Sequence, residues 1–243
     1  MTERLTVREA SAAYESAMRN IPPLERGICT VCRTFIDPEY DTCYRCMMQS
    51  SQLDVVVPIT YSEHLGQMHT ALRNYKDGYG QAQSYAMVRL AAILWRFLEA
   101  HETCVSAAAG ASAFEVVTTV PSSTVERDDR RANLRTMVGW CKPLKDRYRR
   151  VLRATGEAPS GRAYDESRYK AAESLEGRNV LLIDDTWAGG GHAQSAAHAL
   201  RAAGAERVGL VVIGRHVHRD WKIAESDSAG DRLDALPRAF DWD

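Results

Sequence analysis

The stretch VLLIDDTWAGGGHAQSA, residues 180–196, determines the expected fold. Its apolar run from Val180 to Ile183 is typical of a strand buried on both faces, and Asp184 and Asp185 follow at the carboxyl end of that strand. Three glycines then permit a tight turn, and the segment that begins at Gly190 has the composition of a helix. The stretch therefore predicts a strand, a glycine-rich turn and a helix, with two acids beside the turn.

Strand-like and helix-like segments alternate along the rest of the chain. Apolar and β-branched runs predict strands at residues 53–62, 114–121, 178–185 and 207–214. Helices are predicted at residues 62–75, 81–102, 133–153 and 190–203. Such alternation indicates βαβ units, so we expect an α/β fold with a mostly parallel sheet flanked by helices. The polar stretch 156–174 has no clear period and is expected to be a loop.

Four regions are expected along the chain. They are an N-terminal helical segment (1–23), a four-cysteine module (24–50), an α/β domain (51–215) and a C-terminal tail (216–243). Two consecutive prolines, Pro22 and Pro23, end the first region, because proline disfavours continuation of a helix. The tail is mainly polar, and its sequence predicts no particular structure.

The composition excludes several classes of protein. Hydrophobic residues make up 45% of the chain and charged residues 26%, as in an average globular protein. The formal net charge of −1 gives the whole chain no electrostatic footprint for nucleic acid. The chain contains no apolar run of membrane-spanning length, and its first 20 residues lack the apolar core of a secretory signal. We therefore expect a cytoplasmic protein with no membrane partner.

Four of the six cysteines form two closely spaced pairs. They are Cys29, Cys32, Cys43 and Cys46, in the pattern C-x2-C-x10-C-x2-C. Two such turns suit a closed, tetrahedral, structural zinc site; disulfides and an iron–sulfur cluster fit the pattern and the expected compartment less well. Cys104 and Cys141 are expected to be buried or inert thiols.

The acids and the glycine-rich turn indicate a binding site. Ligands of open α/β sheets bind at the carboxyl ends of the strands, and a helix N-terminus favours an anion. Two carboxylates would repel a phosphate, so we expect Asp184 and Asp185 to accept hydrogen bonds from sugar hydroxyls or to lie near Mg2+. A phosphorylated sugar carries both the hydroxyls that the acids would bind and the anion that the helix N-terminus favours. Neither the Walker pattern nor G-x-G-x-x-G is present. A purely structural turn with solvated aspartates remains the alternative.

These residues also support a resemblance to a known family. Residues 180–196 resemble the motif that binds phosphoribosyl pyrophosphate (PRPP) in type I phosphoribosyltransferases. Together with the four cysteines and the stretches ITYSEHLGQMHTALRNYKDG (59–78) and VTTVPSSTVERDDRRAN (117–133), they make the chain similar to the ComF family of phosphoribosyltransferase-like proteins. The resemblance covers about residues 25 to 214, and it implies the type I phosphoribosyltransferase fold with an N-terminal zinc ribbon.

The resemblance implies roles for individual residues. Asp184 and Asp185 would hold the ribose hydroxyls of PRPP. The 5'-phosphate would bind the backbone of the loop formed by Ala188, Gly189, Gly190, Gly191 and His192. The family usually has threonines in this loop and this chain has none, so its binding depends on backbone donors, and His192 is the candidate to replace one hydroxyl.

The diphosphate of PRPP would bind a second loop. The resemblance assigns it to the backbone around Pro121, Ser122 and Ser123, with a charge contribution from arginines that pair well with phosphate oxygens. The candidates are Arg127, Arg130 and Arg131, of which Arg130 is expected to be catalytic; Lys76 and Arg168 are further expected contacts.

The implied reaction is displacement of diphosphate from the ribose anomeric carbon by a nitrogen nucleophile, a nucleobase or an amine, with Mg2+ present. The alternative is a non-catalytic relative that binds nucleotide or single-stranded DNA. The expected zinc ribbon, the missing threonines and the basic segment DRYRRVLR (146–153) favour this alternative, whereas the paired acids oppose it. The acceptor, the pathway and the presence of a homo-oligomer are left open.

Overall fold

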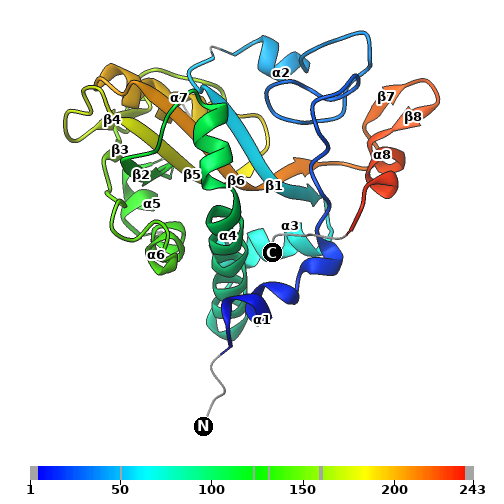
Figure 1. Ribbon diagram of the computed structural model, residues 1–243, viewed down its shortest axis with the longest axis horizontal. Helices are drawn as coiled ribbons and strands as arrows, with labels where there is room; N and C mark the ends of the chain where they lie inside the picture. Colours follow the sequence, from blue (N-terminus) through cyan, green and yellow to red (C-terminus); the bar gives the residue numbers. More distant parts are fainter. Residues whose placement is uncertain (1–4, 50, 123, 131, 159–160, 239–243) are drawn as a thin grey trace.

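The computed structural model describes residues 5–49, 51–122, 124–130, 132–158 and 161–238. Its centre is a four-stranded parallel sheet in the order β1-β6-β5-β2 (Figure 1). The strands are β1 (Val55–Glu63), β2 (Val116–Thr119), β5 (Asn179–Trp187) and β6 (Arg207–Val217). Helices cover the sheet, which confirms the predicted α/β class. Among the described residues, no helix combines the length and the apolar character that crossing a membrane requires.

The two central strands, β5 and β6, carry the most apolar sequence. In β5 all residues from Val180 to Ile183 are fully buried, because parallel strands in the middle of a sheet have helices or other layers on both faces. Side chains alternate between these faces: Leu181 and Ile183 belong to one core cluster, and Val180 and Leu182 belong to the other.

Helices α3 (Gln67–Asp77), α4 (Gly80–Ala108) and α6 (Asn133–Trp140) supply the core on one face of the sheet. The long helix α4 buries Leu90, Ile93 and Leu94 against the strands. The N-terminal helix α1 (Val7–Ala12) and the 3-10 turn η1 (Glu15–Ala17) precede the sheet, and α1 packs on α4 (Figure 1).

The opposite face packs against α7 (Gly191–Ala202), a small hairpin and the cysteine module. The hairpin pairs β3 (Leu152–Ala154) with β4 (Tyr169–Ala171), and the cysteine module contains the short helix α2 (Tyr44–Met47). Arg215 of β6, which is buried, donates to the carbonyl oxygen of Cys32 over 3.1 Å and thereby ties the module to the sheet.

The C-terminal region is folded. It contains β7 (Lys222–Ala224), β8 (Asp227–Ser228) and α8 (Ala229–Ala235), at the edge of the molecule beside β1 (Figure 1). Leu233 and Val217 pack with Ile28 and Phe35 of the cysteine module. This region therefore supports the module from a second side.

Three predicted features of local structure were wrong. The helix expected from Ser62 begins only at Gln67, because β1 continues through Glu63 in register with β6. The helix expected over 133–153 ends at Trp140, before Pro143, which lacks the N–H that helix continuation needs. The expected loop 156–174 contains strand β4.

The two remaining cysteines differ. Cys141 is buried, and burial raises the pKa of its thiol to about 12, so it is inert as expected. Cys104 lies on α4 and is exposed.

The turn between β5 and α7 depends on Gly190. Its φ of +84° lies in the left-handed region, and a Cβ at this position would overlap the indole ring of the buried Trp187. The turn therefore has both a conformational and a steric requirement for glycine, and it sets the direction in which α7 leaves the sheet.

We predict that Gly190→Ala destabilises the protein more than Gly80→Ala, a substitution at another glycine with a positive φ. Gly80 has a φ of +59° and would place a Cβ in open space, so Gly80→Ala isolates the backbone cost of about 1 kcal/mol. The overlap with Trp187 adds about 2 kcal/mol in Gly190→Ala. Chemical denaturation of both variants measures the difference, and equal losses would contradict the role of Trp187.

Candidate functional site

A cavity of about 780 Å³ opens at the carboxyl edge of the sheet. It brings together segments that are far apart in the sequence: the C-terminal half of α3, the loop after β2, the start of α6, and the turn between β5 and α7. Its basic residues are Arg73, Lys76, Arg127, Arg135 and Arg162. Its acidic residues are Asp77, Asp128, Asp184 and Asp185. Both signs of charge line the same space, which suits an anionic ligand that also carries hydroxyl groups or a metal ion.

The two acids of β5 line this cavity from opposite faces of the sheet. The alternation along the strand places Asp184 on the side of α7 and Asp185 on the side of α3. Accordingly Lys76, near the end of α3, lies 2.7 Å from Asp185 Oδ1. Lys76 was expected to contact the ligand directly, and the structure pairs it with an acid of the site.

Burial changes the acidity of both groups. It raises the pKa of Asp184 to about 6, while the Lys76 ammonium opposes the shift. Burial raises the pKa of Asp185 to about 7. The ion pair with Lys76 favours the charged form of Asp185, so desolvation and pairing act against each other there. Ionisation of both carboxyls therefore carries a desolvation cost, and a ligand that supplies hydrogen-bond donors or a cation would stabilise their charged forms.

The glycine loop leads directly into the N-terminus of α7. The first intrahelical hydrogen bond is donated by Gln194 N to Gly190 O over 2.9 Å, so the N–H groups of the three preceding residues have no acceptor within the helix. A Cβ on Gly191 would overlap the backbone of Arg162 and Ala163. The segment between β3 and β4 therefore approaches the start of α7 closely. These N–H groups and the helix dipole form an anion-binding geometry.

His192 contacts a neighbouring loop. Its Nε2 lies 3.1 Å from Gly161 O, and its pKa is lowered by burial, although the contact with Gly161 opposes this. Because a carbonyl oxygen only accepts, Nε2 donates to Gly161 O, and this contact orients the ring. The replacement of one threonine hydroxyl by His192 stays a prediction.

The cysteine module reaches the glycine loop. Gln49 Nε2 donates to Gly189 O over 2.5 Å, and the guanidinium of Arg45 lies so close to Gly189 that a Cβ there would approach its Nη1 to 3.2 Å. The module therefore supports one wall of the site, a role that cysteine spacing alone did not reveal.

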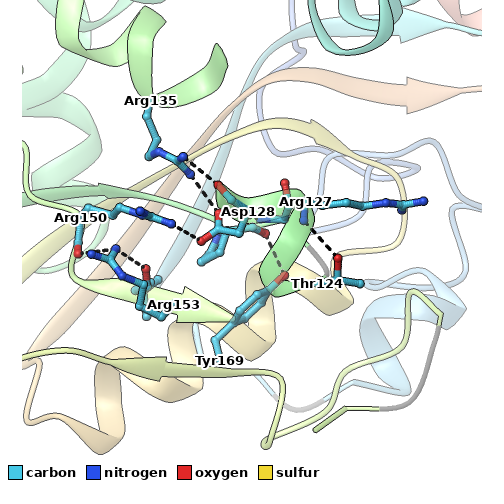
Figure 2. A network of polar contacts seen from close by, with 10 residues as sticks. Thr124, Arg127, Asp128, Arg135, Arg150, Arg153 and Tyr169 are labelled. Atoms are coloured by element: carbon cyan, nitrogen blue, oxygen red, sulfur yellow. Dashed lines mark hydrogen bonds and ion pairs between the residues drawn. The ribbon is translucent and has the colours of Figure 1, made fainter. Parts of the chain in front are cut away.

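The loop after β2 is organised by Asp128, whose side chain is 4% exposed. Asp128 accepts from Arg135 over 3.0 Å and from Arg150 over 2.8 Å, and Figure 2 shows both guanidinium groups converging on it. It also accepts from Ser122 N over 3.2 Å. Tyr169, on β4, donates its hydroxyl to Pro121 O of this loop over 3.0 Å. The loop is therefore held in place by a buried carboxylate before any ligand arrives.

The expected diphosphate contacts are distributed unevenly. Arg127 is exposed, lines the cavity and extends away from Asp128 (Figure 2). Ser122 lines the cavity too, but its N–H is donated to Asp128. Predicted contacts of Ser123, Arg131 and the Arg130 side chain with the diphosphate lie outside the described residues. Arg168 is buried and donates to Ala163 O over 3.2 Å; it does not line the cavity.

Some residues of the site were missed by the sequence analysis. Arg135 lines the cavity and pairs with Asp128, and Asn133 donates to Tyr75 O over 2.6 Å, which links α6 to α3. The one signal available for Arg135 was its nearness in sequence to the basic segment 127–131, within one or two helical turns. Its partner Asp128 could be identified only from the fold.

The four paired cysteines come together at the expected place. Their Sγ atoms all lie within 4.8 Å of one another, with Cys32 Sγ and Cys43 Sγ 3.7 Å apart, and all four are free of disulfides. Thiolates on a tetrahedral zinc ion lie about 3.8 Å apart, given Zn–S bonds of about 2.3 Å. The four cysteines could therefore hold a zinc ion in a module of ribbon type.

Comparisons with known proteins add no assignment: no protein-family model matches the chain, and no curated protein matches it.

The raised pKa of Asp184 predicts a pH-dependent stability. The folded carboxyl holds its proton more tightly than the unfolded one, whose pKa is near 3.8, so its ionisation costs stability as the pH rises from about 4 to about 6. Asp184→Asn removes this cost. In metal-free buffer the variant should gain about 1–3 kcal/mol over the wild type across that window, with no further gain above about pH 7.

Denaturation of both proteins at a series of pH values measures this gain. Asp146→Asn, at an exposed carboxyl outside the cavity, controls for the general loss of one negative charge. A gain that is the same at every pH, or a net loss at high pH, would contradict the burial cost at Asp184.

Proposed function

We propose that the chain is a phosphoribosyltransferase of the ComF type, which binds PRPP together with Mg2+ and transfers the 5-phosphoribosyl group to a nitrogen nucleophile. The observation that carries the proposal is the composition of the cavity. It unites the acids Asp184 and Asp185, the N-terminus of α7 and the arginine-lined loop after β2 at one edge of a parallel sheet. The three parts match the hydroxyls, the 5'-phosphate and the diphosphate of PRPP.

The acids and the helix start would orient the sugar. Asp184 and Asp185 accept hydrogen bonds from the ribose hydroxyls, and such a pair of donors offsets the cost of burying the two carboxylates. The ion pair with Lys76 favours the charged form of Asp185, which is the form that accepts these hydrogen bonds. The backbone N–H groups at the start of α7 bind the 5'-phosphate without needing the absent threonine hydroxyls.

The leaving group is bound on the opposite side of the cavity. Arg127 is exposed and pairs with the diphosphate, while Arg135 contributes positive potential from its position on Asp128. When bound, Mg2+ would supply positive charge that stabilises the diphosphate as it leaves. Asp184 and Asp185 offer the carboxylate oxygens that Mg2+ prefers, so the donor set is chemically suitable.

Zinc has a structural role in this proposal. Four thiolates leave no open position for a substrate, and a module of this size needs a metal to be stable. Through Gln49 and Arg45 the zinc module would hold the glycine loop in its binding conformation.

Calorimetry with PRPP in the presence of Mg2+ tests the proposal. The wild type should bind, and Asp184→Asn/Asp185→Asn should lose about 100-fold or more in affinity, since two charge-assisted hydrogen bonds disappear. Asp146→Asn is the control and should bind as the wild type does. Thermal denaturation of the same samples separates lost binding from lost folding.

Arg127→Ala gives a second arm of the test. This variant should bind PRPP about 10-fold more weakly yet bind ribose 5-phosphate, which has no diphosphate, as well as the wild type does. Absence of PRPP binding by the wild type would overturn the proposal. Binding without diphosphate release in the presence of a panel of nucleobases and amines would instead support the non-catalytic alternative.

A further inference from the structure

Four of the seven histidines gather at one end of the sheet. They are His64, His69, His216 and His218. His64 and His218 are stacked with ring centroids 4.1 Å apart, and His69 lies 5.3 Å from His216. None of these four histidines has a role predicted from the sequence, and none takes part in the proposed binding of PRPP.

The sheet itself creates the cluster. His216 is the second-last residue of β6, and His218 lies just after the strand. The two are two residues apart, so their side chains leave the chain on the same side. The adjacent strand β1 ends at Glu63, and the next residue, His64, donates its N–H to Val217 O over 2.8 Å. The parallel pairing of β1 and β6 therefore places His64 beside His216 and His218.

The ligand atoms of three of these histidines have the spacing of a metal site. One ring nitrogen from each of His64, His216 and His218 lies within 4.8 Å of the others, and Nε2 of His216 is 3.3 Å from Nε2 of His218. Two imidazole nitrogens bound to a tetrahedral zinc ion at about 2.05 Å are about 3.3 Å apart. The pair already has the required separation.

We propose that His64, His216 and His218 form a second metal site, which holds one divalent transition-metal ion such as Zn2+ through three imidazoles. His64 and His216 also line the cavity, so the ion lies at the rim and its fourth position is open to water or to a donor atom of a molecule in the cavity. Three neutral nitrogen ligands with one open position are typical of reactive zinc sites, in contrast to the closed four-cysteine site.

His69 completes the surroundings without being a ligand. Its Nδ1 accepts from Leu65 N over 3.2 Å, so in the neutral ring the proton is on Nε2 and neither nitrogen has a lone pair available. This explains why three of the four histidines, and not all of them, converge with ligand atoms.

Arg215 precedes His216 on β6 and is the charged group next to the cluster on that strand. It donates to backbone oxygens of Cys32, Trp187 and His216, so its hydrogen bonds leave the three ring nitrogens unoccupied by its guanidinium.

Metal content measured by mass spectrometry after dialysis against Zn2+ tests this site. The wild type should retain two ions per chain, one in each of the two ligand groups, and His216→Gln/His218→Gln should retain only the cysteine-bound ion. The control His101→Gln/His198→Gln, which removes two histidines from outside the cluster, should retain two. The measurement uses no PRPP, so its outcome is independent of the proposed reaction.

Titration against a chromophoric chelator gives the affinity. His64→Gln alters an exposed side chain and should leave folding intact, yet it should weaken the second ion by more than about 100-fold, the upper end of the loss seen when an outer-shell partner is removed. The proposal is overturned if the wild type binds a single ion, or if the double variant keeps the second one. In that case the close approach of His216 and His218 is an ordinary N–H···N hydrogen bond.

Discussion

Burial of two carboxylates at the end of β5 is the constraint on which the site depends. The strand needs Val180 to Ile183 inside the sheet, and its pairing with β6 continues through Trp187. Asp184, which is half-buried, and Asp185, which is buried, therefore lie at a poorly solvated edge. Desolvation raises both pKa values, and Lys76 forms an ion pair with Asp185. The protein thus tolerates an energetic cost at this edge that a ligand with hydroxyl groups or a cation would offset.

The other parts of the molecule hold the walls of the same cavity. Gly190 fits against Trp187 and directs α7 so that its N-terminus points into the cavity, and the cysteine module contacts the loop through Gln49. On the far side Asp128 fixes the loop after β2 before any ligand binds. Preorganised walls of this kind reduce the ordering cost of binding a small anionic molecule.

Much of this architecture is predictable from the sequence, because its signals are local. The apolar run of β5, the glycine turn and the cysteine spacing each fix a short segment by themselves. Pro143 is also a local signal, because proline disfavours helix continuation, yet the predicted helix extended beyond it to residue 153. By contrast, the pairing of Asp128 with Arg150 and the meeting of His64 with His216 depend on strand order and register, which bring residues 22 and 152 positions apart into contact. No local pattern encodes such contacts. Resemblance to a family suggested a role for Lys76, but its partner Asp185 became evident only in three dimensions.

The central claim is that the start of α7 binds the phosphate of a sugar whose hydroxyls are held by the acids of β5. Amide nuclear magnetic resonance during titration with PRPP and Mg2+ tests it most directly. The account predicts that the amide signals of Gly191, His192 and Ala193 shift together and saturate, and that Asp184→Asn/Asp185→Asn abolishes these shifts. Signals of α7 that stay unchanged at saturating PRPP, while shifts occur elsewhere or nowhere, would contradict it.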